Sequence, residues 1–283
     1  MIKFIEIIFI VLIIVTSTHR INASGWTKES GKGFYSLEYR VLSGSKYHNA
    51  GGINVAIPKL TDIAFNFYAE YGLTNNLTTI LNFPFYKIKT HDGSGFHLEF
   101  GLENENSGIG DFDFGFRYRL WVDGQTTISS SFILGIPISQ EEGVNTNFGL
   151  PLGDGEFNQT LGLEFGHSLY PMPAYISGSI HFNLRSKGYS EQLYYSVEVG
   201  YKVFSNLLLN IRIHALQSLH NGNNTKLVHR FLFSNNQQFI AYKFGMLYNI
   251  APKFGVSASF ESGIVAYNIQ SAPVFSIGIF LND

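Results

Sequence analysis

The sequence predicts an all-β protein, a transmembrane up-and-down antiparallel β-barrel of about twelve strands, with fourteen as the alternative count. Three observations lead to this fold class. Apolar and polar residues alternate along almost the whole chain, and a strand places successive side chains on opposite faces. Most candidate strands are close to the length of about 9–11 residues that a tilted membrane strand needs. Their apolar faces carry almost no charge, as contact with lipid requires.

The composition supports strands in a membrane and excludes several other classes. Of the 283 residues, 45% are hydrophobic and only 14% are charged, against about 25% charged in an ordinary soluble domain. The net charge of −2 argues against a nucleic-acid partner, because such proteins carry basic patches. The absence of cysteine excludes disulfides, thiolate metal sites and a lipoprotein anchor. No Pro/Ser-rich linker divides the chain, so one barrel domain is expected.

The N-terminus has the pattern of an export signal. Lys3 precedes the apolar run 4–15, and the small residue Ala23 suits the position before a cleavage site. The run is too short to span a bilayer as a helix. We therefore predict that residues 1–23 are a signal peptide and that residues 24–283 form an outer-membrane β-barrel in a Gram-negative bacterium. A retained N-terminal anchor is the alternative.

The first three candidate strands lie at 34–42, 62–72 and 77–88. The third contains Pro84, which cannot donate a hydrogen bond to a neighbouring strand. A bulge or kink is therefore expected at Pro84. Lateral exit of an apolar solute through such a kink is a further hypothesis.

The stretch "SGIGDFDFGFRYRLW" at 107–121 shows the two faces most clearly. One set of alternate residues is aromatic or aliphatic, from Phe112 to Leu120. The other set carries four charges, on Asp111, Asp113, Arg117 and Arg119. We interpret the apolar set as the face toward lipid and the charged set as the face toward the lumen.

Eight further candidate strands complete the barrel, at 126–136, 160–166, 174–185, 192–203, 207–215, 240–248, 254–263 and 274–281. Short turns rich in Asn, Gly and Pro alternate with longer polar loops, as in an up-and-down membrane barrel. An interfacial girdle is expected from the aromatic residues beside the short turns, which are Tyr71, Trp121, Tyr170, Phe204 and Tyr248. The segments 96–102 and 227–233 also alternate. We interpret them as extensions above the membrane, although counting both would give fourteen strands.

The polar faces of the strands provide fourteen candidate residues for the lumen wall or the ligand path. The acidic ones are Glu38, Glu70, Asp111, Asp113, Glu164, Glu198 and Glu261, and the basic ones are Arg40, Arg117, Arg119, Arg185, Lys202, Arg212 and Lys243. A pore selective for one sign of ion uses rings of one charge, so this balance predicts ion pairs that brace the wall and narrow the path. Arg117 and Arg119 are the best candidates for contact with a polar ligand group. A plugged barrel, in which the charges only stabilise the wall, is the alternative.

Trp26 lies in the short segment before the first strand, which is too small for a globular plug. This side chain is expected either in the lumen or at the membrane interface.

The residues give little support for catalysis or for a bound metal. His167 and His181 lie on adjacent candidate strands and Ser130 on an outward face, without the local motif of a hydrolase. His214 and Glu198 supply too few ligands for a metal ion. We therefore predict a protein that is not an enzyme and that needs neither a cofactor nor a metal.

Two segments resemble a known family. "EYGLTNNLTTILNFPFYK" at 70–87 and "SGIGDFDFGFRYRL" at 107–120 are similar to two signatures of the transporter-like barrels of the meta-pathway phenol degradation family. The resemblance is strong over residues 30–140 and rests on pattern alone in the later strands. It implies an outer-membrane barrel, with uptake of small hydrophobic or aromatic compounds for some members, and no catalysis. The chain departs from such barrels at its C-terminus, where "IFLND" places Phe280 three residues from the end.

Together, these features predict an outer-membrane channel or transporter for small solutes, with hydrophobic or aromatic compounds among the candidates. The expected partners are membrane lipid and a small-molecule solute, and no oligomeric state is predicted. Two alternatives stay open at this stage. One is a structural or surface-interaction barrel without transport, and the other is an outer-membrane lipid hydrolase.

Overall fold

The computed structural model describes residues 25–92, 105–139, 150–223 and 235–283. Its strands are β1 Gly33–His48, β2 Asn54–Thr74, β3 Leu77–His91, β4 Glu105–Gly108, β5 Phe112–Val122, β6 Thr126–Ile136, β7 Asn158–Ser168, β8 Ala174–Arg185, β9 Gln192–Phe204, β10 Leu207–Ser218, β11 Gln238–Asn249, β12 Phe254–Tyr267, β13 Ile269–Gln270 and β14 Val274–Asn282. Within these ranges, no helix is long and apolar enough to cross a membrane.

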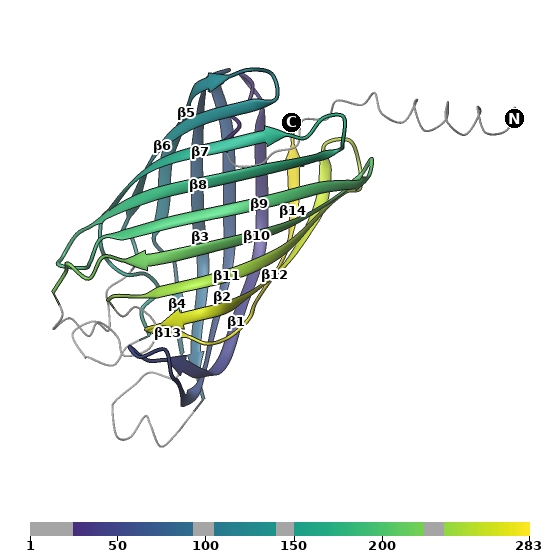
Figure 1. The fold of residues 1–283 in the computed structure, drawn as a ribbon. Helices are drawn as coiled ribbons and strands as arrows, with labels where there is room; N and C mark the ends of the chain where they lie inside the picture. The colour runs from purple at the N-terminus through teal and green to yellow at the C-terminus, as the bar shows by residue number, and fades with distance from the viewer. Residues whose placement is uncertain (1–24, 93–104, 140–149, 224–234) are drawn as a thin grey trace, which may run out of the picture.

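The strands form a closed antiparallel barrel (Figure 1). Twelve of them pair in a ring, in which each strand neighbours the next along the chain and β1 pairs with both β2 and β14. The short strand β4 adds to β3, and β13 adds to β1. The prediction of a twelve-stranded up-and-down barrel is confirmed. The segments 96–102 and 227–233, on which the count of fourteen depended, lie outside the described residues.

The barrel has the inverse polarity of a soluble protein. On β6, Ile128 and Phe132 are 38% and 40% exposed, whereas Ser129 and Ser131 between them are 0% and 2% exposed. The other strands show the same contrast: large apolar side chains cover the outside, and most charged side chains lie inside, together with buried aromatic residues such as Tyr175 and Phe280. This arrangement removes the cost of placing polar groups in hydrocarbon.

The two rims of the barrel differ. The connections 75–76, 123–125, 169–173, 205–206 and 250–253 are short and lie at one end, called here the short-turn rim. β1 begins and β14 ends at this same rim, where the Asp283 N–H donates to the Gly33 carbonyl. The five predicted girdle residues are all exposed at this end, by 40–64% of their surface. The opposite end, called here the long-loop rim, carries the longer connections.

A bulge occurs in β3 beside Pro84, as the sequence predicts. Phe65 pairs with Tyr86 and Asn66 pairs with Pro84, so that Phe85 has no opposite residue on β2. The extra residue reverses the alternation. As a result, the inward positions change from even numbers up to Pro84 to odd numbers from Lys87 onward.

Because of the inverted polarity, we expect an added charge to destabilise the barrel more on the outer face of a strand than on the inner face. We expect Leu163→Arg, on the outer face of β7, to reduce the free energy of unfolding in lipid vesicles by about 2–4 kcal/mol, because the charge enters hydrocarbon. Urea titration of the folded barrel measures this value. Ser196→Arg, on the inner face of β9, is the matched control. An equal or smaller effect of Leu163→Arg would contradict the assignment of the faces.

Candidate solute path through the barrel

A buried charge cluster lies on one side of the lumen near the short-turn rim. Arg117 on β5 donates from Nη1 to Glu70 Oε1 on β2 (2.9 Å) and from Nε to Glu164 Oε2 on β7 (2.6 Å). The Tyr68 hydroxyl donates to the same Glu70 oxygen (2.7 Å). All three charged residues are less than 10% exposed. Removing one partner of such a buried pair leaves an uncompensated charge, so the cluster fixes three parts of the wall relative to one another.

Residues 25–28 lie inside the short-turn end of the lumen, bind this cluster and are called here the N-terminal segment. The Gly25 N–H donates to Glu164 Oε2 (3.1 Å), and Ser129 Oγ donates to the Gly25 carbonyl (2.6 Å). Arg117 Nη1 also donates to the Trp26 carbonyl (3.3 Å). Lys28 Nζ lies 3.4 Å from Glu70 Oε2. The segment therefore narrows the lumen from the short-turn side.

The Trp26 side chain points into the lumen, which resolves the two positions that the sequence left open. Its ring meets Tyr175 edge to face, with centroids 6.2 Å apart. The ring also lies against Gly166, where a Cβ atom would stand 2.2 Å from it. Only glycine at this position of β7 leaves room for the indole.

The connection between β6 and β7 narrows the lumen from the long-loop side. Leu150 and Leu152 are buried, and Lys87 Nζ donates to the Leu152 carbonyl (2.7 Å). Asp111 accepts hydrogen bonds from three backbone N–H groups of this connection. Asp111 is thus an anchor for the loop and does not face open lumen.

Ion pairs hold the same loop to β8. Arg185 pairs with Glu156, which is buried, and lies 3.5 Å from Asp154. Burial raises the pKa of Asp154 to about 6, and the neighbouring Asp111 acts in the same direction. The loop therefore loses a negative charge when the pH falls below this value.

Other predicted lumen residues pair locally. Arg212 on β10 binds Glu198 on β9 at 2.7 Å, and the Tyr175 hydroxyl donates to the same carboxylate (2.5 Å). Asp113 accepts from Asn82 (3.1 Å). Arg119 leaves the lumen at the short-turn rim, where its Nε donates to Asn76 Oδ1 (3.1 Å).

A second group of predicted residues has few partners. Glu261 lies 3.5 Å from His214 Nε2. Four side chains form no hydrogen bond and no ion pair with other described residues, namely Glu38, Arg40, Lys202 and Lys243. The fourteen candidates thus divide into paired residues, mostly on β2 to β10, and less constrained residues on β1, β9, β11 and β12.

Sequence reasoning missed several charged residues of the interior. Lys87 and Lys89 both approach Asp62 Oδ2, at 3.9 and 3.5 Å. Lys87 follows the bulge at Phe85, which reverses the alternation, and Lys89 lies beyond the predicted strand 77–88. Lys28 and Glu156 lie outside the strands, where alternation gives no signal.

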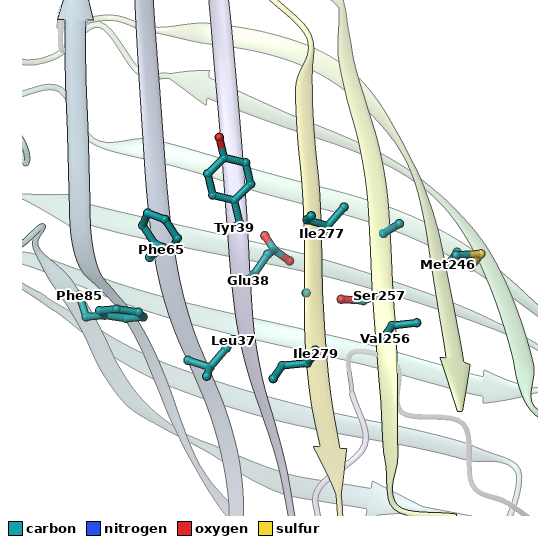
Figure 2. A pocket seen from close by; sticks show the side chains of 12 residues that line it. Leu37, Glu38, Tyr39, Phe65, Phe85, Met246, Val256, Ser257, Ile277 and Ile279 are labelled. Atoms are coloured by element: carbon teal, nitrogen blue, oxygen red, sulfur yellow. The ribbon is translucent and has the colours of Figure 1, made fainter. Parts of the chain in front are cut away.

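The outer surface carries an apolar groove of about 600 Å³ where the first and last strands meet (Figure 2). Its side chains come from β3, β2, β1, β14, β12 and β11, and they include Phe85, Phe65, Leu37 and Ile277. Phe85 is the bulged residue of β3. The groove therefore adjoins the irregular part of the wall.

No catalytic pair or metal cluster is found in the part of the chain that the structure describes. His181 lies on the lumen side, 3.4 Å from Glu164, whereas Ser130 is on the outer face. His167 contacts Thr126 (2.8 Å). Among the described residues, no group of three or more His, Asp or Glu side chains could hold a metal ion.

The fold matches solved outer-membrane barrels. The COG4313 outer membrane channel from Pseudomonas putida F1 matches with a TM-score of 0.66 at 11% identity, over 93% of this chain and 99% of that one. This chain has the fold of an outer-membrane β-barrel. The NanC porin gives a TM-score of 0.53 at 9% identity, over 87% and 98% of the two chains. The translocator domain of the autotransporter NalP from Neisseria meningitidis gives 0.52 at 8% identity, over 98% and 95%.

No protein-family model and no curated protein matches the sequence. The family resemblance at 70–87 and 107–120 therefore rests on the sequence signatures.

The charge cluster predicts a specific loss of stability. We expect Arg117→Met to reduce the free energy of unfolding by about 3–5 kcal/mol, because Glu70 and Glu164 would remain buried without their partner. Denaturant titration of the barrel in vesicles measures this change. Arg119→Met, at the exposed rim, should cost about 1 kcal/mol or less. Similar effects of the two substitutions would show that the cluster does not brace the wall.

Proposed function

We propose that the protein is an outer-membrane channel that passes small solutes, hydrophobic and aromatic compounds among them, beside its N-terminal segment. One observation carries this proposal. The hydrogen bonds of residues 25–28 end on β3, β5, β6 and β7 and on the turn after β2, so that the segment is held against one side of the lumen. The opposite side has small inward residues, such as Ser257 and Ser259 on β12.

The location and the family follow from the same features. The apolar outer surface and the barrel closure support the outer membrane of a Gram-negative bacterium, reached through a signal peptide at residues 1–23. The two sequence signatures support membership of the meta-pathway phenol degradation family. The solved barrels that share this fold are a channel, a porin and a translocator domain, which supports a protein that is not an enzyme.

An apolar solute would have a second way out of the barrel. The outer groove and the bulge at Phe85 lie together on the wall formed by β1, β2 and β3. An irregular ladder is easier to open than a regular one, because fewer hydrogen bonds hold it. We propose lateral exit into the membrane at this place for apolar solutes alone.

Removal of the N-terminal segment tests the main path. We expect deletion of residues 25–31 to raise the single-channel conductance in planar bilayers by about twofold or more, because the segment narrows a lumen of intermediate width. Trp26→Gly should give a smaller increase. Trp121→Gly, at the outer surface, is the matched control and should leave the conductance unchanged. A wild-type barrel and a deletion variant that both fail to conduct would favour the structural barrel without transport.

The lateral exit has its own test. We expect Pro84→Ala to slow the uptake of an apolar dye into vesicles that contain the barrel, because an added N–H allows a more regular ladder. Uptake of a charged dye of similar size should not change. Unchanged uptake of the apolar dye would count against lateral exit and would leave the axial path unaffected.

A further inference from the structure

Residues 150–157, called here the strap, lie across the inner wall at the long-loop end of the barrel. Near one end of the strap, Lys87 on β3 donates to the Leu152 carbonyl (2.7 Å). At its other end, the Phe157 N–H donates to Ser186 Oγ, directly after β8 (2.9 Å). The strap therefore links two strands of the ring that three others separate, which are β5, β6 and β7.

Asp111 holds the middle of the strap. Its Oδ2 accepts from the Gly155 N–H (3.2 Å). Its Oδ1 accepts from the N–H groups of Ile138 and Ser139, where the same connection leaves β6 (3.0 and 2.8 Å). Gly153 passes so close that a Cβ atom there would collide with Asp111 Oδ2. Both oxygens of Asp111 thus serve as acceptors for peptide groups.

Three carboxyl groups meet one guanidinium group where the strap is seated. Arg185 on β8 pairs with the buried Glu156 and lies 3.5 Å from Asp154 Oδ2. Asp154 also shares a side-chain hydrogen bond with Asp111. Such a bond requires a proton on one of the two carboxyl groups, because an ionised carboxylate can only accept. The proton belongs to Asp154, since Asp111 already accepts from three peptide N–H groups.

Other charged or titratable side chains act on Asp154 from the surrounding elements. Within the described residues they are Lys87 on β3, Asp113 on β5, Tyr189 in the connection after β8 and Tyr194 on β9. In the connection after β8, Lys187 donates to the Gly155 carbonyl of the strap. Lysine and tyrosine ordinarily titrate at about pH 10, whereas Asp113 is a carboxyl group like Asp154. Asp113 is therefore the residue from which an effect of Asp154 must be distinguished.

The protonation of Asp154 is linked to the position of the strap. Burial raises the pKa of the Asp154 carboxyl from 3.8 to about 6, while Arg185 lowers it and Asp111 raises it further. The seated strap therefore binds this proton more tightly than a released strap does. By linkage, the seat gains stability as the pH falls below about 6 and loses it as the pH rises.

We propose that the strap is a gate that acid tightens: a proton held between Asp154 and Asp111 fixes the strap across the lumen, and loss of the proton lets the strap leave its seat. This inference rests on the proposed channel function. It adds a control of the path by the pH of the medium at the long-loop rim.

Chemical labelling tests the gate without requiring transport. The chain contains no cysteine, so Leu152→Cys, at a buried position of the strap, provides a single reactive site. We expect a charged maleimide to label it in micelles about tenfold more slowly at pH 5.0 than at pH 7.5, as the pKa values of 3.8 and about 6 require. Each rate is divided by that of Ser205→Cys, at the exposed short-turn rim, which corrects for ionisation of the thiol.

Two further variants identify the carboxyl group that responds. In Leu152→Cys/Asp154→Asn, the amide is neutral and donates to Asp111 at both pH values, so labelling should be slow at both. Asp113→Asn is the matched control, because Asp113 accepts from Asn82 and forms no described bond with the strap. It should keep the tenfold response. An equal corrected rate at the two pH values without the Asp154 substitution, or a response that survives Asp154→Asn, would overturn the gate.

Single-channel recording connects the gate to the channel. We expect openings to be about tenfold less frequent at pH 5.0 than at pH 7.5, and this difference to be absent in Asp154→Asn. A current whose pH dependence is unchanged by Asp154→Asn would contradict the gate. The labelling response in a barrel that carries no current at either pH would support the proton-held strap and contradict the proposed channel.

Discussion

The structure depends on one constraint, which is that hydrocarbon offers no hydrogen-bond partner to a peptide group. A sheet in a bilayer must therefore have no free edge. The chain meets this requirement by pairing its first and last long strands, β1 and β14, from Phe34 opposite Asn282 to Leu42 opposite Val274. Closure in turn determines the polarity of every strand, because one face then meets lipid and the other encloses the lumen.

The enclosed face must accommodate polar groups at a low dielectric constant, and the two sides of the lumen do so differently. On one side, Arg117 forms ion pairs with two carboxylates and binds the N-terminal segment, whose Lys28 supplies a second positive charge. On the other side, β12 and β14 have small inward residues, and the charged residues of β1 and β11 have fewer partners. The N-terminal segment thus occupies one side of the interior of a barrel of intermediate width.

The strands could be predicted from the sequence because alternation is a local signal with a period of two. The predicted bounds 126–136 and 174–185 agree with β6 and β8. Contacts between distant segments carry no such signal. The contact of Trp26 with Gly166 joins residues that are 140 positions apart in the sequence. The face on which Lys87 lies depends on a bulge two residues earlier.

Prediction of the candidate site was correspondingly partial. The inward set contained Glu70, Arg117 and Glu164, but alternation alone did not indicate that they meet across three strands. The sequence predicts that Asp111 and Arg185 face the lumen. In the structure, both side chains bind the connection between β6 and β7, which folds back over them. The position of a loop depends on its packing against distant residues, which the alternation of residues along the strands does not indicate.

The way in which the N-terminal segment is held has a consequence for how its sequence can change. The wall recognises its main chain at four atoms, which are the nitrogen and oxygen of Gly25, the oxygen of Trp26 and the nitrogen of Lys28. Every peptide offers these same groups, apart from proline, which lacks the N–H. The segment is therefore held mainly through its backbone, and the wall residues that bind it, Glu164, Ser129 and Thr78, tolerate substitution less well than most of its own side chains.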